Sequence, residues 1–236
     1  MDLKRFFSAN SINDSEVVIL TGDEFYHAVK VCRLKEGFKF IACDNSGYDY
    51  YCEVSSISKD KLTGRVEKAV YNETNNEADI TLFIGANKEI DKIVQKAVEI
   101  GVKTLVPFTS QHTNVSTVNK ERLNKIVLES SKQCGRATLM EVRTLTTFNE
   151  LILSAEKSDK LFFYEQERNK KVNSVLTDKS KSIALIIGGE GGFSESEAQS
   201  AIDNGWNSVT LGPRILRVET AVVSALTLIL QGAGRI

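Results

Sequence analysis

Over the first 70 residues, apolar side chains come in short runs separated by turn residues, which is the pattern of a small β unit. The runs predict four strands, over residues 17–20, 38–43, 48–56 and 62–66. Asp44-Asn45-Ser46-Gly47 predicts the turn of a hairpin. Phe25, Val29 and Cys32 share one side of a predicted helix over residues 23–34. Short strands joined by tight turns favour a small barrel.

A polar segment at residues 71–78 has no apolar period and predicts a linker between two domains, 1–72 and 73–236. Beyond it, apolar strands and amphipathic helices alternate. Strands are predicted at residues 80–85, 104–106 (ended by Pro107) and 161–164, and helices at residues 88–100 (ended by Gly101) and 119–132 (capped by Asn119). This alternation predicts an α/β domain with a mainly parallel sheet covered by helices on both faces.

A glycine-rich loop follows the next apolar run. Residues 183–187 are continuously apolar, which predicts a strand buried on both faces. In the loop 188–193, four glycines surround the carboxylate of Glu190, and glycine lets a ligand approach the backbone closely. Ser-Glu-Ser-Glu at 194–197 is a capping box, which predicts a helix that ends at Gly205.

A second irregular loop follows the strand predicted at residues 209–211. Gly212-Pro213 ends that strand, and a very apolar helix is predicted over residues 220–230. Two loops therefore leave the carboxyl ends of two strands, which is where open α/β sheets bind ligands.

Composition narrows the class of protein. The 236 residues are 42% hydrophobic and 26% charged, as in ordinary globular proteins. No apolar run approaches the ~20 residues of a membrane span, and the start of the chain is too short and too charged for a signal peptide. We therefore expect a cytoplasmic protein with no membrane partner. The formal net charge is −1, so an RNA site has to be a local basic patch.

The cysteines show no metal-site or redox spacing. Cys32, Cys43, Cys52 and Cys134 contain no C-x-x-C pair. We expect reduced thiols that mostly fill the core, and no metal. With only His27 and His112 in the chain, histidine-based triads and zinc sites have few candidate ligands.

Familiar glycine motifs do not match the first loop. The pattern G-x-G-x-x-G fails because Ser194 replaces the last glycine, and G-x-x-x-x-G-K-[ST] fails because Phe193 stands at its second glycine. The hydrolase motif G-x-S-x-G is absent. Alone, Gly188–Gly192 reads equally well as a tight turn; the second loop after the neighbouring strand favours a binding site.

The two loops together resemble the ribosomal RNA small-subunit methyltransferase E family, of the SPOUT class. The matching segments are 187–193, 211–221, His27 with Val31–Leu34, 95–102 and Gln133–Arg136. The resemblance covers nearly the whole chain. Gly189 departs from it, because the family usually reads I-G-P-E-G-G; glycine in place of proline gives a more flexible loop.

The resemblance implies a SPOUT α/β domain with a C-terminal trefoil knot, preceded by a PUA-like RNA-binding β-barrel, in a homodimer. It implies an S-adenosylmethionine-dependent enzyme that methylates ring nitrogen N3 of a uridine in 16S rRNA. It also implies which residues bind the cofactor: Gly188, Glu190, Gly191, Gly192, Leu211, Gly212, Ile215, Leu216 and Arg217.

Charged residues of the two loops suit this chemistry. Uridine N3 attacks best as an anion, and Arg217 is the candidate to stabilise that charge or to orient an rRNA phosphate. Glu190 or Glu219 is the candidate to accept the proton or to hold Arg217. The structural alternatives are an ordinary Arg217–Glu219 ion pair and Glu219 as a first-turn helix acid.

RNA contacts are expected at basic residues outside the loops: Arg5, Lys30, Arg33 and Arg136, with Lys35 nearby in the sequence. For Arg5, Lys30, Arg33 and Lys35, a solvated surface charge is an equally good interpretation. Two other functions stay open, methyl transfer to a ribose 2′-hydroxyl and a non-catalytic RNA-binding or ribosome-assembly factor. The intact pair of loops argues against the latter. Free 16S rRNA and the assembled small ribosomal subunit both stay candidate substrates.

Overall fold

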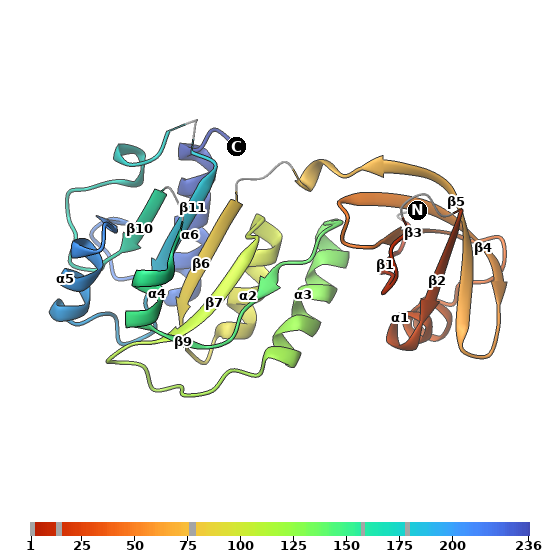
Figure 1. The fold of residues 1–236 in the computed structure, drawn as a ribbon, viewed down its shortest axis with the longest axis horizontal. Coiled ribbons are helices and arrows are strands. Elements are labelled where there is room, and N and C mark those ends of the chain that lie inside the picture. Colours follow the sequence, from red (N-terminus) through yellow and green to blue (C-terminus); the bar gives the residue numbers. More distant parts are fainter. Residues whose placement is uncertain (1–2, 13–15, 76–78, 157–158, 178–179) are drawn as a thin grey trace. The chain divides into compact units, whose positions relative to one another are not determined.

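The computed structural model describes residues 3–12, 16–75, 79–156, 159–177 and 180–236 (Figure 1). It separates into two compact units. The small unit comprises residues 1–76 and 128–139, and the large unit comprises residues 77–127 and 140–236.

A five-stranded sheet forms the small unit. Its strands are β1 (Arg5–Phe7), β2 (Val17–Thr21), β3 (Lys39–Cys43), β4 (Tyr48–Ile57) and β5 (Lys61–Tyr71), in the order β1-β3-β4-β5-β2. The β1–β3 pair is parallel and the others are antiparallel. The four predicted strands are confirmed. β1 was not predicted, because three residues are too few to show a period. The predicted linker is partly structured: β5 reaches Tyr71, a 3₁₀ turn (η2) covers Glu73–Asn75, and residues 76–78 lie outside the described residues.

The helix predicted over residues 23–34 is shorter and changes type. α1 (Gly22–Tyr26) continues into a π-helical turn, η1 (His27–Val31). Arg33 ends it by taking a left-handed φ of 57°. The Leu34 N–H then donates to Ala28 O at 3.0 Å. As predicted, the same side of the helix packs against the core of the unit, which it reaches through Phe25, Val29 and Cys32.

A buried ion pair is linked through Asn72 to the second chain segment of the small unit. Arg5 donates to both carboxylate oxygens of Asp49, with Nη2 at 2.9 Å from Oδ2, and both side chains are about nine-tenths buried. Asn72 Nδ2 donates to Asp49 Oδ2 at 3.0 Å and to Gly135 O at 2.9 Å. Burial opposes ionisation of Asp49, but hydrogen bonds from Arg5 and Asn72 and the charge of Arg5 outweigh it, so the pKa of Asp49 is lowered.

The large unit is a parallel sheet with helices on both faces, as predicted. Its strands are β6 (Asp79–Gly85), β7 (Thr104–Thr109), β8 (Glu141–Val142), β9 (Thr146–Thr147), β10 (Asp159–Phe163), β11 (Ser182–Ile187) and β12 (Asn207–Val209). They lie in the order β12-β10-β11-β6-β7-β8, with β9 also beside β7, and every pair is parallel. The trefoil knot stays a prediction.

Two pairs of helices cover the sheet, α4 (Phe148–Ser154) with α5 (Glu195–Asp203) and α2 (Ile90–Ile100) with α6 (Val218–Gly232) (Figure 1). A fifth helix, α3 (Lys120–Cys134), follows β7, and a 3₁₀ turn, η3, covers Val172–Ser174. α4 and α5 bury their apolar sides in one aromatic core with the sheet, whereas α2 and α6 pack against each other. Among the described residues, no helix is long and apolar enough to cross a membrane.

Start and stop signals of three helices are confirmed, whereas the strand predicted at residues 209–211 lies two residues earlier, as β12. The Arg122 N–H donates to the cap Asn119 Oδ1 at 3.0 Å, and Ser194 and Glu197 form the capping box of α5. Gly101 ends α2 in the left-handed conformation, with φ 101°. α4 has an unpredicted capping box of its own at Thr147.

Pro107 does not end its strand, contrary to the sequence prediction. β7 continues through Pro107 to Thr109. Arg143 N donates to Leu105 O at 2.9 Å on the side of β7 away from β6, so Pro107, two residues on, has its nitrogen on that same side. On that side, β8 pairs with β7 as far as Leu105, and β9 pairs with β7 from Phe108 onward. The missing N–H therefore falls where no ladder bond is required.

The cysteines of the described residues are free thiols, as predicted. Cys43 and Cys52 are fully buried, and burial raises the pKa of each thiol to about 12. Both are therefore protonated core residues.

Asp49→Asn is expected to lower the free energy of unfolding by about 3 kcal/mol at pH 7, because Arg5 stays buried without its partner. Ionised Asp49 stabilises the fold fully above the ordinary carboxyl pKa of about 3.9, and this stabilisation is lost as the pH falls through the lower folded-state pKa. The difference in the free energy of unfolding between the unmodified protein and the variant therefore decreases as the solution becomes acidic. Urea unfolding from pH 7 to pH 3 measures it, with exposed Asp60→Asn as the control. A difference that stays constant with pH would contradict the assignment.

Candidate functional site

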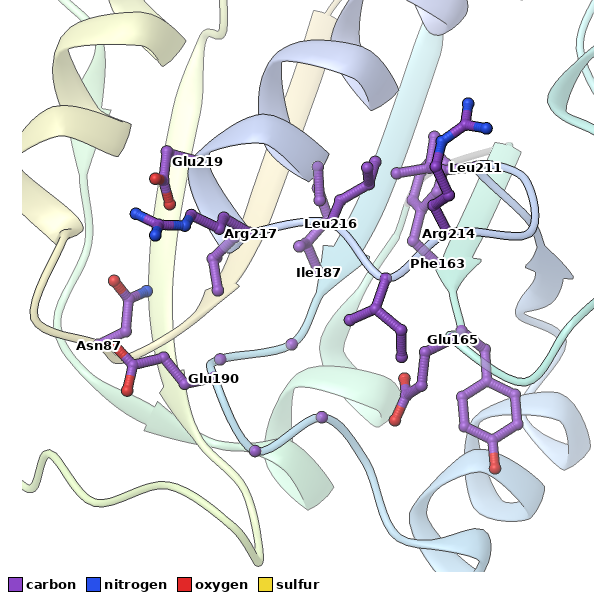
Figure 2. Close-up of a pocket in the computed structure, with 18 of the residues that line it drawn as sticks. Asn87, Phe163, Glu165, Ile187, Glu190, Leu211, Arg214, Leu216, Arg217 and Glu219 are labelled. Atoms are coloured by element: carbon purple, nitrogen blue, oxygen red, sulfur yellow. The ribbon is translucent and has the colours of Figure 1, made fainter.

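A cavity of about 610 Å³ lies in the large unit where β6, β10, β11 and β12 end (Figure 2). The loops after β11 and β12 form most of its wall. Every residue that the sequence analysis assigned to the cofactor or to catalysis lies on this wall: Gly188, Glu190, Gly191, Gly192, Leu211, Gly212, Ile215, Leu216, Arg217 and Glu219. The sheet thus brings together two loops that the sequence separates.

Glycines in the first loop are required by packing. A Cβ on Gly85, at the end of β6, would come closer to the Gly189 nitrogen than the 3.0 Å that real Cβ contacts respect. A Cβ on Gly188 would lie 2.9 Å from the Phe193 ring, and one on Gly191 would lie 2.6 Å from His112 Cβ. Gly189 itself has room, since a Cβ there would meet its nearest atom at 3.5 Å. The loop therefore lies flat over the strand ends.

Phe193 anchors the end of this loop. Its ring packs edge-on against Phe162, with centroids 4.7 Å apart, and stacks on Phe108 at 6.2 Å. It is 5% exposed, in the aromatic core beneath α4 and α5. The backbone of the loop is thus fixed from below while its upper side borders the cavity.

The second loop presents unpaired backbone to the cavity. Gly212 adopts φ 105°, and its N–H donates to Thr210 Oγ1 at 3.1 Å. Among the described residues, no hydrogen-bond partner is found for the backbone N–H groups of Leu211, Ile215 and Leu216. α6 begins directly after Arg217, whose carbonyl accepts from Ala221 N at 2.8 Å. Peptide donors and apolar side chains therefore face the same space.

Charged groups gather on one side of the cavity. Figure 2 shows the Arg217 side chain ending between Glu219 and Asn87, with Glu190 beyond Asn87. In the described part of the chain, Arg217 and Glu219 form no ion pair, so this structural alternative is not found. The exposed guanidinium of Arg217 is therefore not neutralised by that neighbour.

Lys92 and Glu89 extend this charged side. Hydrogen bonding and the charge of Lys92 lower the pKa of Glu89, and Arg217 adds to the effect. Glu89 in turn raises the pKa of Lys92, with a smaller contribution from Glu219. Each shift stabilises the charged form, so Glu89 and Lys92 are both charged at neutral pH.

Several residues on or beside the cavity wall were missed by the sequence analysis. Asn87 is 5% exposed and shapes the turn after β6: Nδ2 donates to Gly85 O at 2.7 Å and Oδ1 accepts from Glu89 N at 2.9 Å. Tyr164 and Glu165 follow β10. The signal available was their position directly after predicted strands. His112 gave no such signal, since it reaches Gly191 through the long loop after β7.

The predicted RNA-binding residues lie in the small unit, in two different environments. Arg5 is buried in its pair with Asp49, and Arg136 is 6% exposed, so neither forms an open basic surface. Lys30 and Arg33 are exposed on and just after the π-helical turn, and Lys35 is exposed beyond them. An RNA contact therefore rests on the exposed residues.

Lys132 occupies a nearby polar cluster of the small unit. Glu24, His27 and Glu129 have the spacing of metal ligands. The Lys132 side chain is 7% exposed and bonds to Glu24, and its Nζ lies 3.0 Å from Glu129 and 3.5 Å from His27 Nδ1. The ammonium thus supplies the positive charge that a cation would otherwise bring.

Comparisons with known proteins agree along the chain. Residues 72–230 match the family model described as an RNA methyltransferase domain, and residues 20–67 match an RNA methyltransferase PUA domain. The chain is 31% identical to ribosomal RNA small subunit methyltransferase E of Aquifex aeolicus, over 91% of this chain and 94% of that protein. It is 29% identical to the Bacillus subtilis protein of the same name, over 96% of both.

A solved structure extends the likeness to the fold. It is that of a ribosomal RNA small subunit methyltransferase E from Neisseria gonorrhoeae bound to S-adenosyl methionine. The TM-score is 0.87 at 26% identity, and the match covers 98% of both chains.

Proposed function

The chain belongs to the ribosomal RNA small subunit methyltransferase E family, and we propose that it transfers a methyl group from S-adenosylmethionine to ring nitrogen N3 of a uridine in 16S rRNA, in the cytoplasm. The observation that carries the proposal is the cavity at the strand ends, walled by the glycine loop and by a second loop with unpaired backbone N–H groups, with Arg217 at its charged side. The bound cofactor of the Neisseria relative supports the same assignment.

The cavity suits S-adenosylmethionine in size and chemistry. At about 610 Å³ it lies within the range of small-molecule sites, roughly 300–1,000 Å³. An adenine ring has an apolar face and a polar edge. Ile187, Leu211 and Leu216 supply apolar contacts, and the free N–H groups of the second loop supply donors for the edge. The glycine loop, where a Cβ would crowd its neighbours, admits the rest of the ligand against the backbone.

Each charged residue then has a distinct task. Bound S-adenosylmethionine supplies the methyl group on a cationic sulfonium. Arg217, free of an ion pair with Glu219, stabilises the negative charge that develops on the uracil oxygens as N3 loses its proton. Glu190 or Glu219 accepts that proton. Gly188–Gly192 and Leu211–Arg217 hold the reactants in place, and positioning contributes much of the rate when two bound groups react.

Mapping of rRNA methylation tests the function. In a strain lacking this protein, 16S rRNA is expected to lose methylation at N3 of one uridine, and plasmid expression of the chain is expected to restore it. Nuclease digestion and mass spectrometry of the nucleosides identify the modified atom. A methyl group on a ribose 2′-hydroxyl would replace the proposed acceptor, and an unchanged methylation pattern would favour a non-catalytic RNA-binding factor.

Gly191→Ala is expected to weaken S-adenosylmethionine binding by tenfold or more. The new Cβ would lie 2.6 Å from His112 Cβ and 2.8 Å from the His112 carbonyl, so the glycine loop has to move. Calorimetry measures the affinity. Gly232→Ala in α6 is the matched control, because its Cβ would meet its nearest atom at 3.4 Å. Unchanged affinity in Gly191→Ala would remove this loop from the site.

RNA docking and methyl transfer are proposed to lie in different units. Arg33→Ala should weaken RNA binding and reduce its salt dependence by about one phosphate contact while leaving cofactor affinity intact. Arg217→Ala should slow single-turnover methylation by about a hundredfold. Its effect on RNA affinity should be smaller, because the contact strengthens in the transition state. Near-normal turnover of Arg217→Ala at saturating RNA and cofactor would make Arg217 a structural residue.

We also propose a homodimer that uses α6. One side of this helix is buried within the unit, whereas Val223 is 36% exposed, and Ala221 and Leu228 are partly exposed elsewhere on the helix. A helix that is apolar nearly all round favours burial on more than one side. Light scattering at micromolar concentration should give twice the chain mass. Val223→Glu should shift it toward the monomer, whereas Leu153→Glu, at a 73% exposed position on α4, should not. A monomeric unmodified protein would reject the dimer.

A further inference from the structure

The side of the cavity away from Arg217 carries an acidic group. Glu165 follows β10, lines the cavity, and in Figure 2 extends its carboxylate toward the glycine loop, on the other side of the cavity from Asn87 and Glu190. Among the described residues, no lysine or arginine forms an ion pair with it.

The first glycine loop holds this carboxylate in place. The Phe193 N–H donates to Glu165 Oε1 at 3.2 Å. Gly192 has φ 64°, and a Cβ on it would run into the same oxygen, so glycine at 192 makes room for the carboxylate. No described hydrogen-bond donor pairs with Oε2. The fold thus fixes Oε1, and Oε2 is left to accept a hydrogen bond from a ligand.

A second acidic side chain, Glu195, adds to the negative charge near this end. Partial burial raises the pKa of the Tyr164 phenol, and the charges of Glu165 and Glu195 raise it further, so the phenol stays neutral. A carboxylate among such neighbours is best satisfied by a hydrogen-bond donor, above all a positively charged one.

We propose that Glu165 is a specificity-determining residue that accepts a hydrogen bond from S-adenosylmethionine, from the ammonium of its amino-acid part or from a ribose hydroxyl. The inference rests on the proposed function. It places the charged or hydroxylated part of the ligand at the β10 end and leaves the Arg217 side for the RNA base.

Binding of three ligands to Glu165→Gln tests the inference. The glutamine keeps the size of the side chain and an acceptor oxygen but removes the charge. Calorimetry with S-adenosylmethionine and S-adenosylhomocysteine should show binding that is about tenfold weaker or more. Methylthioadenosine keeps the ribose and lacks the amino-acid part. If Glu165→Gln loses as much affinity for methylthioadenosine as for the other two ligands, the donor is a ribose hydroxyl. If its affinity for methylthioadenosine is unchanged, the donor is the ammonium.

Two controls keep the result specific. Glu195→Gln removes a nearby charge that does not line the cavity, and it should bind all three ligands normally. An equal loss in Glu195→Gln would show a general field effect and overturn a direct contact. Thermal unfolding checks that Glu165→Gln folds, and Glu165→Asp, which keeps the charge but shortens the side chain, should bind between the unmodified protein and Glu165→Gln.

The outcomes separate this inference from the proposed function. If the unmodified protein binds S-adenosylmethionine and Glu165→Gln binds it equally well, the role of Glu165 is wrong and the function stands. If the unmodified protein does not bind S-adenosylmethionine, both are wrong.

Discussion

The close approach of two backbones, at Gly85 and Gly189, determines the shape of the site. β6 and β11 are neighbours in the sheet, and the chain leaving β11 passes directly over the end of β6 with no space for a side chain between them. The loop therefore lies against the sheet, and the wall it offers consists of peptide groups. Gly188 and Gly191 face neighbours that exclude a Cβ, and Gly192 has a positive φ, so these glycines are required by packing and backbone conformation.

Gly189 is the informative exception in this loop. A Cβ there would meet only ordinary contacts, the nearest at 3.5 Å, and the residue lies outside the left-handed region. Packing therefore leaves room for a β-carbon at this position, in contrast to Gly188 and Gly191. Glycine here gives the loop the backbone freedom that proline, the residue suggested by the family resemblance, would remove.

Local signals predicted the fold better than they predicted the site. The capping box at Ser194, the stop at Gly101 and the cap at Asn119 act within one turn of helix, so their neighbours in the sequence suffice to predict them. Glu165 and His112 meet the glycine loop from other parts of the sheet, and no local pattern carries that information. The charge of a residue also did not predict its burial. Arg5 lies in a buried ion pair, whereas Arg33 lies on the surface.

The division of α3 between the units has a consequence for how the protein is made. Its first half belongs to the large unit, whereas residues 128–139 belong to the small unit, where Gly135 accepts a hydrogen bond from Asn72. The small unit is therefore assembled from two stretches of chain with about fifty residues of the other unit between them. During synthesis the N-terminal sheet emerges first but cannot complete its packing until residue 139 has been translated. Completion of the small unit therefore depends on contacts between segments far apart in the sequence, which form more slowly than local contacts.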